Sequence, residues 1–518
     1  MSSDISHASD FTTAKDNVQT NIEVEKGQTY AIEKPPHYKI LYPNVDEAAL
    51  LRKIDLRLVP ILSALYILAF LDRVNIGNAA LFGLKSDLNL GGDEYNTALV
   101  IFFVPYILFE VPSNFLMKKF KPHVWLPCCL FAFGLVTILQ GLVKNYSGLL
   151  TTRFFLGLFE AGMLPGCFYL ISMYAIVVPA GRIPKALYLL FLLDIVGGCL
   201  WWAPRECNWE DERDTGISRM ALGVYSRCVD HSELLFMNSA NMHECEEGVL
   251  TCSLAFLFYI LIPDFPEEAT WLSADEKAVI DARLKEDVGN SGIREPMTFK
   301  RAVNVIKDYK VILAGLMYFG LIVPAYSLVL FSPSIIQGLG NHGSIHTQLL
   351  SVPPFASAFV VGMLVATLSD YFRHRFIFII CGLMLSLVGF IILRVEHHDM
   401  NLQYGAIFLA ATGTYSSMPI VLCWFSMNVR GHLNRAVATG WQIGFGNIGG
   451  IIASYAFLPK DSPKYFTGYN ICISFVCLTL VTSCLYLVGV LYENSQMDKK
   501  VTDTASEGDG EEEFRYFT

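Results

Sequence analysis

Long apolar runs recur along this chain, and they restrict its fold more than any other feature of the sequence. A helix needs about 20 apolar residues to cross the hydrocarbon core of a bilayer. Ten runs reach this length, near 58–81, 95–117, 124–143, 150–175, 309–332, 347–369, 375–394, 403–427, 436–458 and 468–491, and two poorer ones lie near 185–203 and 249–263. Because 53% of the residues are hydrophobic and 17% are charged, a soluble core could not hide this much apolar surface. We therefore predict an all-α polytopic membrane protein.

The runs form two groups of six around a charged stretch at 264–308. Lysine and arginine near the ends of spans mark the cytoplasmic side of a membrane protein. They gather here in alternate loops, at Lys118, Lys119, Lys121, Arg182, Lys185, Lys300, Arg301, Lys307, Arg373, Arg375, Arg430, Arg435, Lys499 and Lys500. This pattern fits twelve transmembrane helices with both ends in the cytoplasm, and it does not fit a seven-helix receptor. We expect a disordered cytoplasmic tail at 1–57, a first six-helix half at 58–263, a central cytoplasmic loop at 264–308, a second six-helix half at 309–492 and a cytoplasmic tail at 493–518.

The two groups of runs also resemble each other weakly. A basic hairpin at 115–121 follows the second run, and another at 368–375 follows the eighth. Internal repeats of this kind are typical of secondary transporters. The eleventh run is rich in glycine between 440 and 450, without the preceding strand or the following lysine of a phosphate-binding loop. Close helix packing explains these glycines better.

Two apolar runs each contain a pair of oppositely charged residues: Asp72 and Arg73 in the first, and Arg153 and Glu160 in the fourth. A charge at bilayer depth costs roughly 2.5–3.5 kcal/mol on insertion scales, so it persists mainly where it faces a partner or a polar pathway. Arginine grips carboxylates bidentately, and a carboxylate shielded from water can bind a proton near neutral pH. The pattern suggests an anion site coupled to protons. Alternatively, the two residues of each run neutralise each other as a fixed ion pair.

Other classes of function find no support in the sequence. The net charge of −10 comes largely from the soluble ends, such as the acidic run at 511–513, so we expect no nucleic-acid partner. We find no Walker motif, metal-ligand array or nucleophile with its base. We therefore expect no enzyme, no metal and no cofactor.

Several local motifs resemble one transporter family. They are FLDRVNIGNA at 70–79, VPSN at 111–114, RFFLGLFEAG at 153–162, PDFPEEATW at 263–271 and WQIGFGNIGG at 441–450. Together they resemble the anion:cation symporter branch of the major facilitator superfamily, and most closely its fungal nicotinate and allantoate permeases. The resemblance implies a major facilitator fold, with twelve helices as two pseudo-symmetric six-helix halves.

The resemblance also implies a function. It points to proton-coupled uptake of a small organic anion by alternating access, with a nicotinate-like monocarboxylate or a related vitamin as substrate and the proton gradient as driving force. Allantoate, ureidosuccinate or another carboxylate is the alternative substrate, and a non-transporting nutrient sensor on a transporter scaffold is the alternative class. We expect a monomer in the lipid bilayer of the plasma membrane.

The matching positions assign roles to residues. The resemblance implies that Arg73 and Arg153 bind the anion and that Asp72 and Glu160 couple protons. We add further candidates for substrate contact, Asn75, Tyr318, Trp441, Gln442 and Asn447, with Tyr326 and Trp424 as other rings in spans expected to line the cavity. Each of these could instead pack, and Asn75 could bond to backbone.

Gating residues are expected near the loops. Asp370, Arg373 and Arg375 resemble the superfamily's motif between paired helices, although they could simply be positive-inside signals. Glu110 could make a gating bond to a basic loop, or it could be a buried acid with satisfied oxygens.

The match to the family fails between Gly198 and Glu247. There the fifth run is short and gains Asp194, and a charged tract containing Cys207 and Cys228 follows. The sixth run of about 15 residues would extend only about 22 Å, against a hydrocarbon core of about 30 Å. The tract at 199–247 is either a long outer loop or an error in the gene prediction, with a shifted frame and a translated intron, and we favour the second interpretation.

Overall fold

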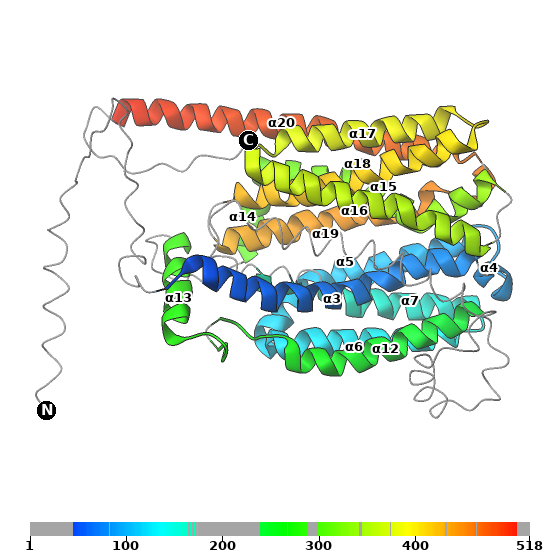
Figure 1. Cartoon of the computed structure of the whole chain (residues 1–518), viewed down its shortest axis with the longest axis horizontal. Helices are drawn as coiled ribbons and strands as arrows, with labels where there is room; N and C mark the ends of the chain where they lie inside the picture. The colour runs from blue at the N-terminus through cyan, green and yellow to red at the C-terminus, as the bar shows by residue number, and fades with distance from the viewer. Residues whose placement is uncertain are drawn as a thin grey trace, which may run out of the picture. The chain divides into compact units, whose positions relative to one another are not determined.

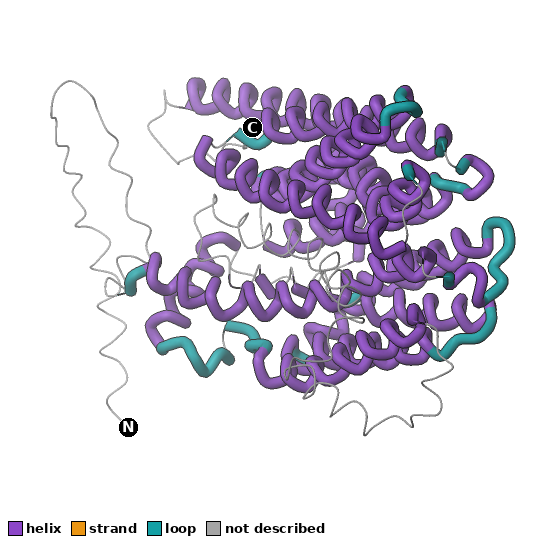
Figure 2. Tube along the Cα trace, turned by 45° about the vertical axis from the view of Figure 1, so that its right-hand side comes forward, coloured by secondary structure: helices purple, strands orange, loops and turns teal. Residues whose placement is uncertain are grey.

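The computed structural model describes residues 45–163 except 82, isolated positions between 166 and 174, residues 239–288 except 267, and residues 299–504 except 341–343, 373, 430–431 and 463. Every regular element within these ranges is helical, as Figure 2 shows. Residues 1–44 of the predicted tail at 1–57, residues 505–518 of the predicted tail at 493–518, the predicted fifth span at 185–203 and most of the anomalous tract lie outside the described residues.

The long helices of the transmembrane part form two groups that run side by side (Figure 1). The first group holds α3 (Glu47–Leu81), α5 (Glu94–Phe120), α6 (Pro122–Gly141), α7 (Tyr146–Glu160) and α12 (Ser239–Leu261), with the short α4 (Leu84–Asp87) after α3. The second holds α15 (Tyr309–Leu339), α16 (Ser344–Phe372), α17 (Phe376–Val395), α18 (Met400–Met427), α19 (His432–Ala456) and α20 (Phe466–Thr504), with the 3-10 turn η1 (Pro459–Asp461) before α20. Contacts of α3 with α15 and of α5 with α19 join the groups.

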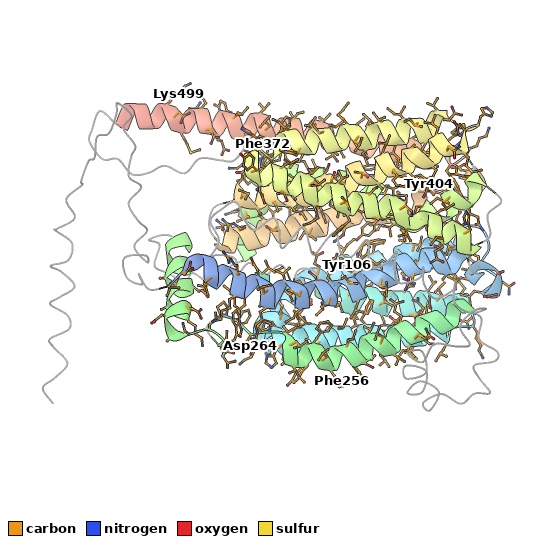
Figure 3. All side chains as sticks on the ribbon, in the orientation of Figure 1. Tyr106, Phe256, Asp264, Phe372, Tyr404 and Lys499 are labelled. Carbon is orange, nitrogen blue, oxygen red and sulfur yellow. The ribbon has the colours of Figure 1, made fainter. Side chains whose placement is uncertain are left out.

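Seven helices within the described ranges are long and apolar enough to cross a membrane: parts of α3, α6, α15, α16, α17, α18 and α20. Apolar side chains also cover the outside of the bundle: Phe256 of a further helix, α12, is labelled in Figure 3 and is 67% exposed. A surface of this kind requires lipid rather than water around it. The prediction of an all-α polytopic membrane protein is therefore confirmed.

Two helices begin earlier than the sequence predicts. Helix α3 starts at Glu47, inside the predicted tail, because Leu50 and Ile54 are buried one turn apart on its inner face. Helix α12 starts at Ser239, ten residues before the predicted sixth span, and 23 residues are long enough to cross the hydrocarbon core. A span predicted from hydropathy stops at Glu247 and Glu244 because both residues carry charge, but in the structure both side chains are buried within the bundle.

Close helix crossings depend on glycine. In α18, an added Cβ at Gly413 would lie 2.9 Å from the Ser386 Cα of α17 and closer still to neighbouring backbone atoms. Where α6 crosses α12, a Cβ at Gly134 would lie 3.0 Å from the carbonyl oxygen of Gly248. The glycine-rich stretch of α19 packs in the same way, with Gly446 against Tyr318, so helix packing is confirmed as its role.

The central loop begins with a segment docked on the first group of helices. Lys53 Nζ of α3 lies 2.8 Å from Glu276 Oε2 of α13 (Ala274–Val288), and Lys121 Nζ lies 2.7 Å from Glu268 Oε2. Burial raises the pKa of Glu276, but the hydrogen bonds from Lys53 and Ser273 lower it by more, so the pKa lies below its ordinary value. This half-exposed pair contributes under about 1 kcal/mol at neutral pH and is lost as the pH falls through that lowered pKa.

Candidate functional site

The two groups of helices meet around a buried arginine. Arg73 of α3 is 5% exposed, and its Nη2 lies 2.5 Å from Oε1 of Glu160, which is 1% exposed at the end of α7. The same guanidinium donates from Nη1 to the hydroxyl of Tyr326 on α15. One side chain of the first group is thus held by a carboxylate from its own group and by a hydroxyl from the other.

Aromatic rings enclose this arginine. The Cζ atom of Arg73 lies 4.7 Å from the ring centroid of Tyr106 and 5.1 Å from that of Phe102, both on α5, and 5.6 Å from that of Tyr326. Tyr106 is labelled near the centre of Figure 3. Rings in these positions favour a cation electrostatically while keeping water away from it. The ion pair therefore lies in a dry, polarised environment, where charge interactions are strong.

A second carboxylate lies one turn further along α5. Glu110 is 2% exposed, and its Oε2 is 3.2 Å from the position of an added Cβ at Gly444 of α19. It interacts with the Asn447 side chain and with the charge of Arg73, but neither carboxylate oxygen makes a hydrogen bond of regular geometry. The predicted bond from Glu110 to a basic loop is wrong, because α5 directs this side chain at α19 instead.

Asn447 connects Glu110 with the arginine. Its Oδ1 is 3.5 Å from the Tyr326 hydroxyl, which Arg73 also contacts. Tyr318, one of the predicted substrate contacts, is fully buried under Gly446 and interacts electrostatically with Tyr326, Tyr106 and Glu110. The structure therefore brings Arg73, Glu160, Glu110, Tyr318 and Asn447 together, as candidates from both groups of helices.

Two other predicted contacts lie one helix turn or more from this cluster. The Trp441 ring stacks on Phe445 with centroids 5.4 Å apart. Gln442 donates from Nε2 to the carbonyl oxygen of Ala314 at 3.4 Å. Both lie nearer than Asn447 to the end of α19 that begins at His432, where they pack against neighbouring groups outside the cluster.

Asn75 binds a carboxylate that the sequence analysis did not single out. Its Nδ2 donates to Oε2 of Glu247 on α12, and both residues are buried. One turn before Glu247 on α12, Glu244 Oε1 accepts a hydrogen bond of 3.0 Å from Gln140 Nε2 of α6. Asn75 therefore has a buried carboxylate as a side-chain partner, besides the substrate and backbone partners considered from the sequence. Buried acids in α12 could have drawn attention, but they fall in the tract where the family match fails.

The ion pair that the structure shows at these charges joins two helices. Arg73 of α3 binds Glu160 of α7 although 87 positions separate them. Arg153 is buried on the same helix as Glu160 and lies within electrostatic range of Tyr95. Asp72 contributes its backbone to α3, but its side chain, and with it the alternative of an Asp72–Arg73 pair, lies outside what is described.

The two groups touch from the level of Arg73 to the end of the bundle near α4. Asn96 Nδ2 of α5 donates to the Ser454 carbonyl of α19 at 2.6 Å, and the hydroxyls of Thr97 and Tyr455 are 3.0 Å apart. Further in, Phe103 lies edge-on to Tyr326 with ring centroids 5.1 Å apart. These contacts close the bundle on the side opposite α13.

The predicted gating motif forms a compact pair in the second group. Arg375, 2% exposed at the start of α17, places Nη2 2.5 Å from Oδ1 of Asp370 on α16 and donates from Nη1 to Ser369 Oγ at 2.9 Å. Arg373 lies outside the described residues. Trp424 packs nearby against Tyr486, with ring centroids 4.7 Å apart, and is far from the central cluster. Its predicted place in the cavity is wrong.

Removing the acid of this pair should destabilise the second half. In Asp370→Asn, the buried Arg375 guanidinium loses its counter-charge, and breaking a buried pair typically costs about 3–5 kcal/mol. We expect a clear fall in the melting temperature of detergent-solubilised protein. The double variant Asp370→Asn/Arg375→Met should recover most of the loss, and equal instability of the single and double variants would contradict the ion-pair explanation.

Sequence comparison now adds to this geometry. The profile of the Major Facilitator Superfamily matches residues 62–177. MFS transporter prlL, from Fungal sp. (strain NRRL 50135), is 32% identical over 431 residues, which cover 81% of this chain and 82% of prlL. The chain belongs to the major facilitator superfamily. MFS-type transporter efuF of Hormonema carpetanum is 30% identical over 453 residues, 86% of each chain. This major facilitator is therefore a multi-pass membrane transporter for small molecules and not an enzyme.

Solved structures agree with this assignment of the fold. A bacterial homologue of the human lysosomal transporter Spinster, in an inward-facing and unoccupied conformation, superposes with a TM-score of 0.59 at 15% identity, covering 84% of this major facilitator and 96% of that chain. The E. coli fucose:proton symporter FucP gives a TM-score of 0.54 at 10% identity, covering 82% and 97%. The predicted major facilitator fold is confirmed.

Proposed function

We propose that this major facilitator is a proton-coupled carrier for a small organic anion. The observation that carries the proposal is the Arg73–Glu160 pair, buried where the two halves meet and hydrogen-bonded to Tyr326 of the second half. Guanidinium stays protonated at any physiological pH and binds carboxylates in a fork geometry. A pair of this kind at bilayer depth is expensive, and such residues mark substrate or ion pathways.

Competition between Glu160 and the substrate for the Arg73 guanidinium would couple anion transport to proton transport. A substrate carboxylate arriving at Arg73 displaces Glu160, whose carboxylate then lies in a dry site without its cation. The neutral form of an acid is favoured there, so Glu160 binds a proton as the anion binds Arg73. Release of the anion restores the ion pair and expels the proton. Arg153 and Asp72 are the second anion-binding and proton-binding candidates in this scheme.

Rocking of the two halves would alternate access to the site. Arg73 and Glu160 belong to the first half and Tyr326 to the second, so the full set of contacts around Arg73 forms only when the two halves are in contact. The contacts of α5 with α19 close one side in the present structure. The Asp370–Arg375 pair would hold the second half rigid at the opposite end during this movement.

The substrate we propose first is a nicotinate-like monocarboxylate or related vitamin. One arginine with three aromatic rings around it suits a single carboxylate on a flat ring, since rings stack on one another with offset geometry. The sequence motifs that resemble nicotinate and allantoate permeases support this choice. Allantoate or another carboxylate comes second, and a nutrient sensor on the same scaffold is the alternative from another class. We place the carrier in the plasma membrane as a monomer.

The test is uptake of labelled nicotinate, pantothenate, biotin and allantoate in yeast that lacks its own carriers. We expect one compound to accumulate faster at acidic than at neutral pH and to lose accumulation when a protonophore is added. In Glu160→Gln, which cannot change charge, accumulation should fall at least tenfold. Surface-expressed protein that carries no compound of the panel would overturn the proposed substrate class, and uptake that ignores the protonophore would overturn proton coupling.

A further inference from the structure

Glu110 has a position that the scheme above does not use. It lies in α5, is 2% exposed, and neither of its oxygens has a hydrogen bond of regular geometry. Two other buried polar groups beside it also lack one, the hydroxyl of Tyr106 and the amide nitrogen of Asn447. A native site with several such groups close together is unusual, because a buried polar group without a partner costs about 1–3 kcal/mol.

The charges around Glu110 do not compensate it in the present state. Among the described residues, the titratable and charged groups that interact with Glu110 are Arg73 of α3, Tyr318 and Tyr326 of α15, and Tyr106 on its own helix, and Glu160 of α7 shares Arg73, Tyr106 and Tyr326 with it. Arg73 is the cation among them, and Glu160 contacts it directly at 2.5 Å. From α19, Glu110 meets the neutral Asn447 and Gly444. An ionised Glu110 would thus be a second anion sharing one cation already in contact with a carboxylate.

The surroundings of Glu110 change when the halves separate. Its neighbours Asn447 and Gly444 belong to the second half, whereas Glu110 belongs to the first. Parting of α5 from α19 would admit water, which stabilises the charged carboxylate, and rejoining them would favour the neutral acid.

We propose that Glu110 is a second proton-binding residue of the transport cycle: it takes up a proton from the side opposite α13 as α5 and α19 close over the bound anion there, and it releases the proton to the side of α13 when the helices part toward that side. The inference rests on the proposed function. Glu160 binds its proton when the substrate anion binds Arg73, whereas Glu110 binds and releases its proton as the conformation changes. A monovalent anion would then travel with two protons, so the cycle would move one net positive charge and respond to membrane voltage.

The experiment compares Glu110→Gln, Glu110→Asp and the unaltered carrier in proteoliposomes, using the transported compound from the yeast panel. Asp93→Asn is the matched control, because Asp93 is exposed at the start of the same helix and its side chain makes no capping bond. Two quantities are measured: accumulation driven by an imposed pH gradient, with and without an inside-negative potential, and exchange of labelled for unlabelled substrate.

We expect Glu110→Gln to lose accumulation at least tenfold and to lose its response to voltage, while exchange falls less than threefold. Glu110→Asp should retain accumulation with a displaced pH profile, and Asp93→Asn should behave as the unaltered carrier. Accumulation by Glu110→Gln within twofold of the unaltered protein would overturn the proposal, as would equal loss of exchange and accumulation. If the unaltered carrier itself shows no accumulation driven by the imposed pH gradient, the proposed function fails, and this result is distinct from a failure confined to the Glu110 variants.

Discussion

Arg73→Ala will reduce uptake at least 100-fold without lowering the amount of protein in the membrane. The substitution removes the cation that binds Glu160 and Tyr326, and it removes the group expected to bind the substrate carboxylate. Loss of a buried charge partner costs about 3–5 kcal/mol, and a factor of 100 corresponds to about 2.7 kcal/mol. Initial uptake rates, normalised to surface protein, measure the effect.

Controls separate charge from shape at this position. Arg73→Lys keeps the charge but loses the fork geometry that also reaches the Tyr326 hydroxyl, so we expect it to recover less than a tenth of the rate. Arg394→Ala is the matched control, because Arg394 contacts Asn470 and Phe466 far from the cluster and should lose little. Uptake by Arg73→Ala above a tenth of the native rate would contradict the role assigned to this arginine.

Gly413→Ala will destabilise the second half by about 2–3 kcal/mol, whereas Gly405→Ala, eight positions earlier on the same helix, will not. An added Cβ at Gly413 meets backbone atoms of α17, among them the Ser386 Cα at 2.9 Å, and backbone cannot rotate away. At Gly405 nothing lies within 4 Å of the added atom. Alanine there should be neutral or stabilise by up to about 1 kcal/mol through its helix propensity.

Thermal unfolding of the two variants in the same detergent tests this contrast. Gly413→Ala should melt earlier and give less monodisperse protein, and Gly405→Ala should match or exceed the unaltered carrier. Equal melting temperatures of both variants would show that α17 and α18 adjust their crossing more easily than the contact distances indicate.

Hydropathy alone predicts much of the fold. The predicted spans from 309–332 to 468–491 correspond to α15 to α20, because each run is longer and more apolar than a soluble helix requires. The early start of α3 is less visible in the sequence, since its first turns are amphipathic rather than apolar, with Lys53 turned toward Glu276. The start of α12 is hidden for a related reason, because Glu244 and Glu247 interrupt the run, and the folded bundle is needed to bring them their partners from α6 and α3.

The candidate site is predictable as a set of residues but not as a set of pairs. Charges inside apolar runs identify Arg73 and Glu160 at once, yet their pairing depends on how α3 packs beside α7. Tyr106 was missed, although its place one turn before Glu110 on the same face of α5 is a usable signal. Whether a buried polar atom finds a partner depends on the opposing helix, and α19 lies more than 300 positions further along the chain.

The docked segment ending in α13 also limits how far the carrier can move. Helix α13 is held to the first half through Lys53, whereas α14 (Phe299–Ile306) packs against α15 and α19 of the second. Val288 and Phe299 are therefore attached to different halves, and the eleven chain steps between them span at most about 40 Å when fully extended. That length is an upper limit on how far these two helix ends can separate, so shortening the connection should restrict opening on this side before it affects the binding of any solute.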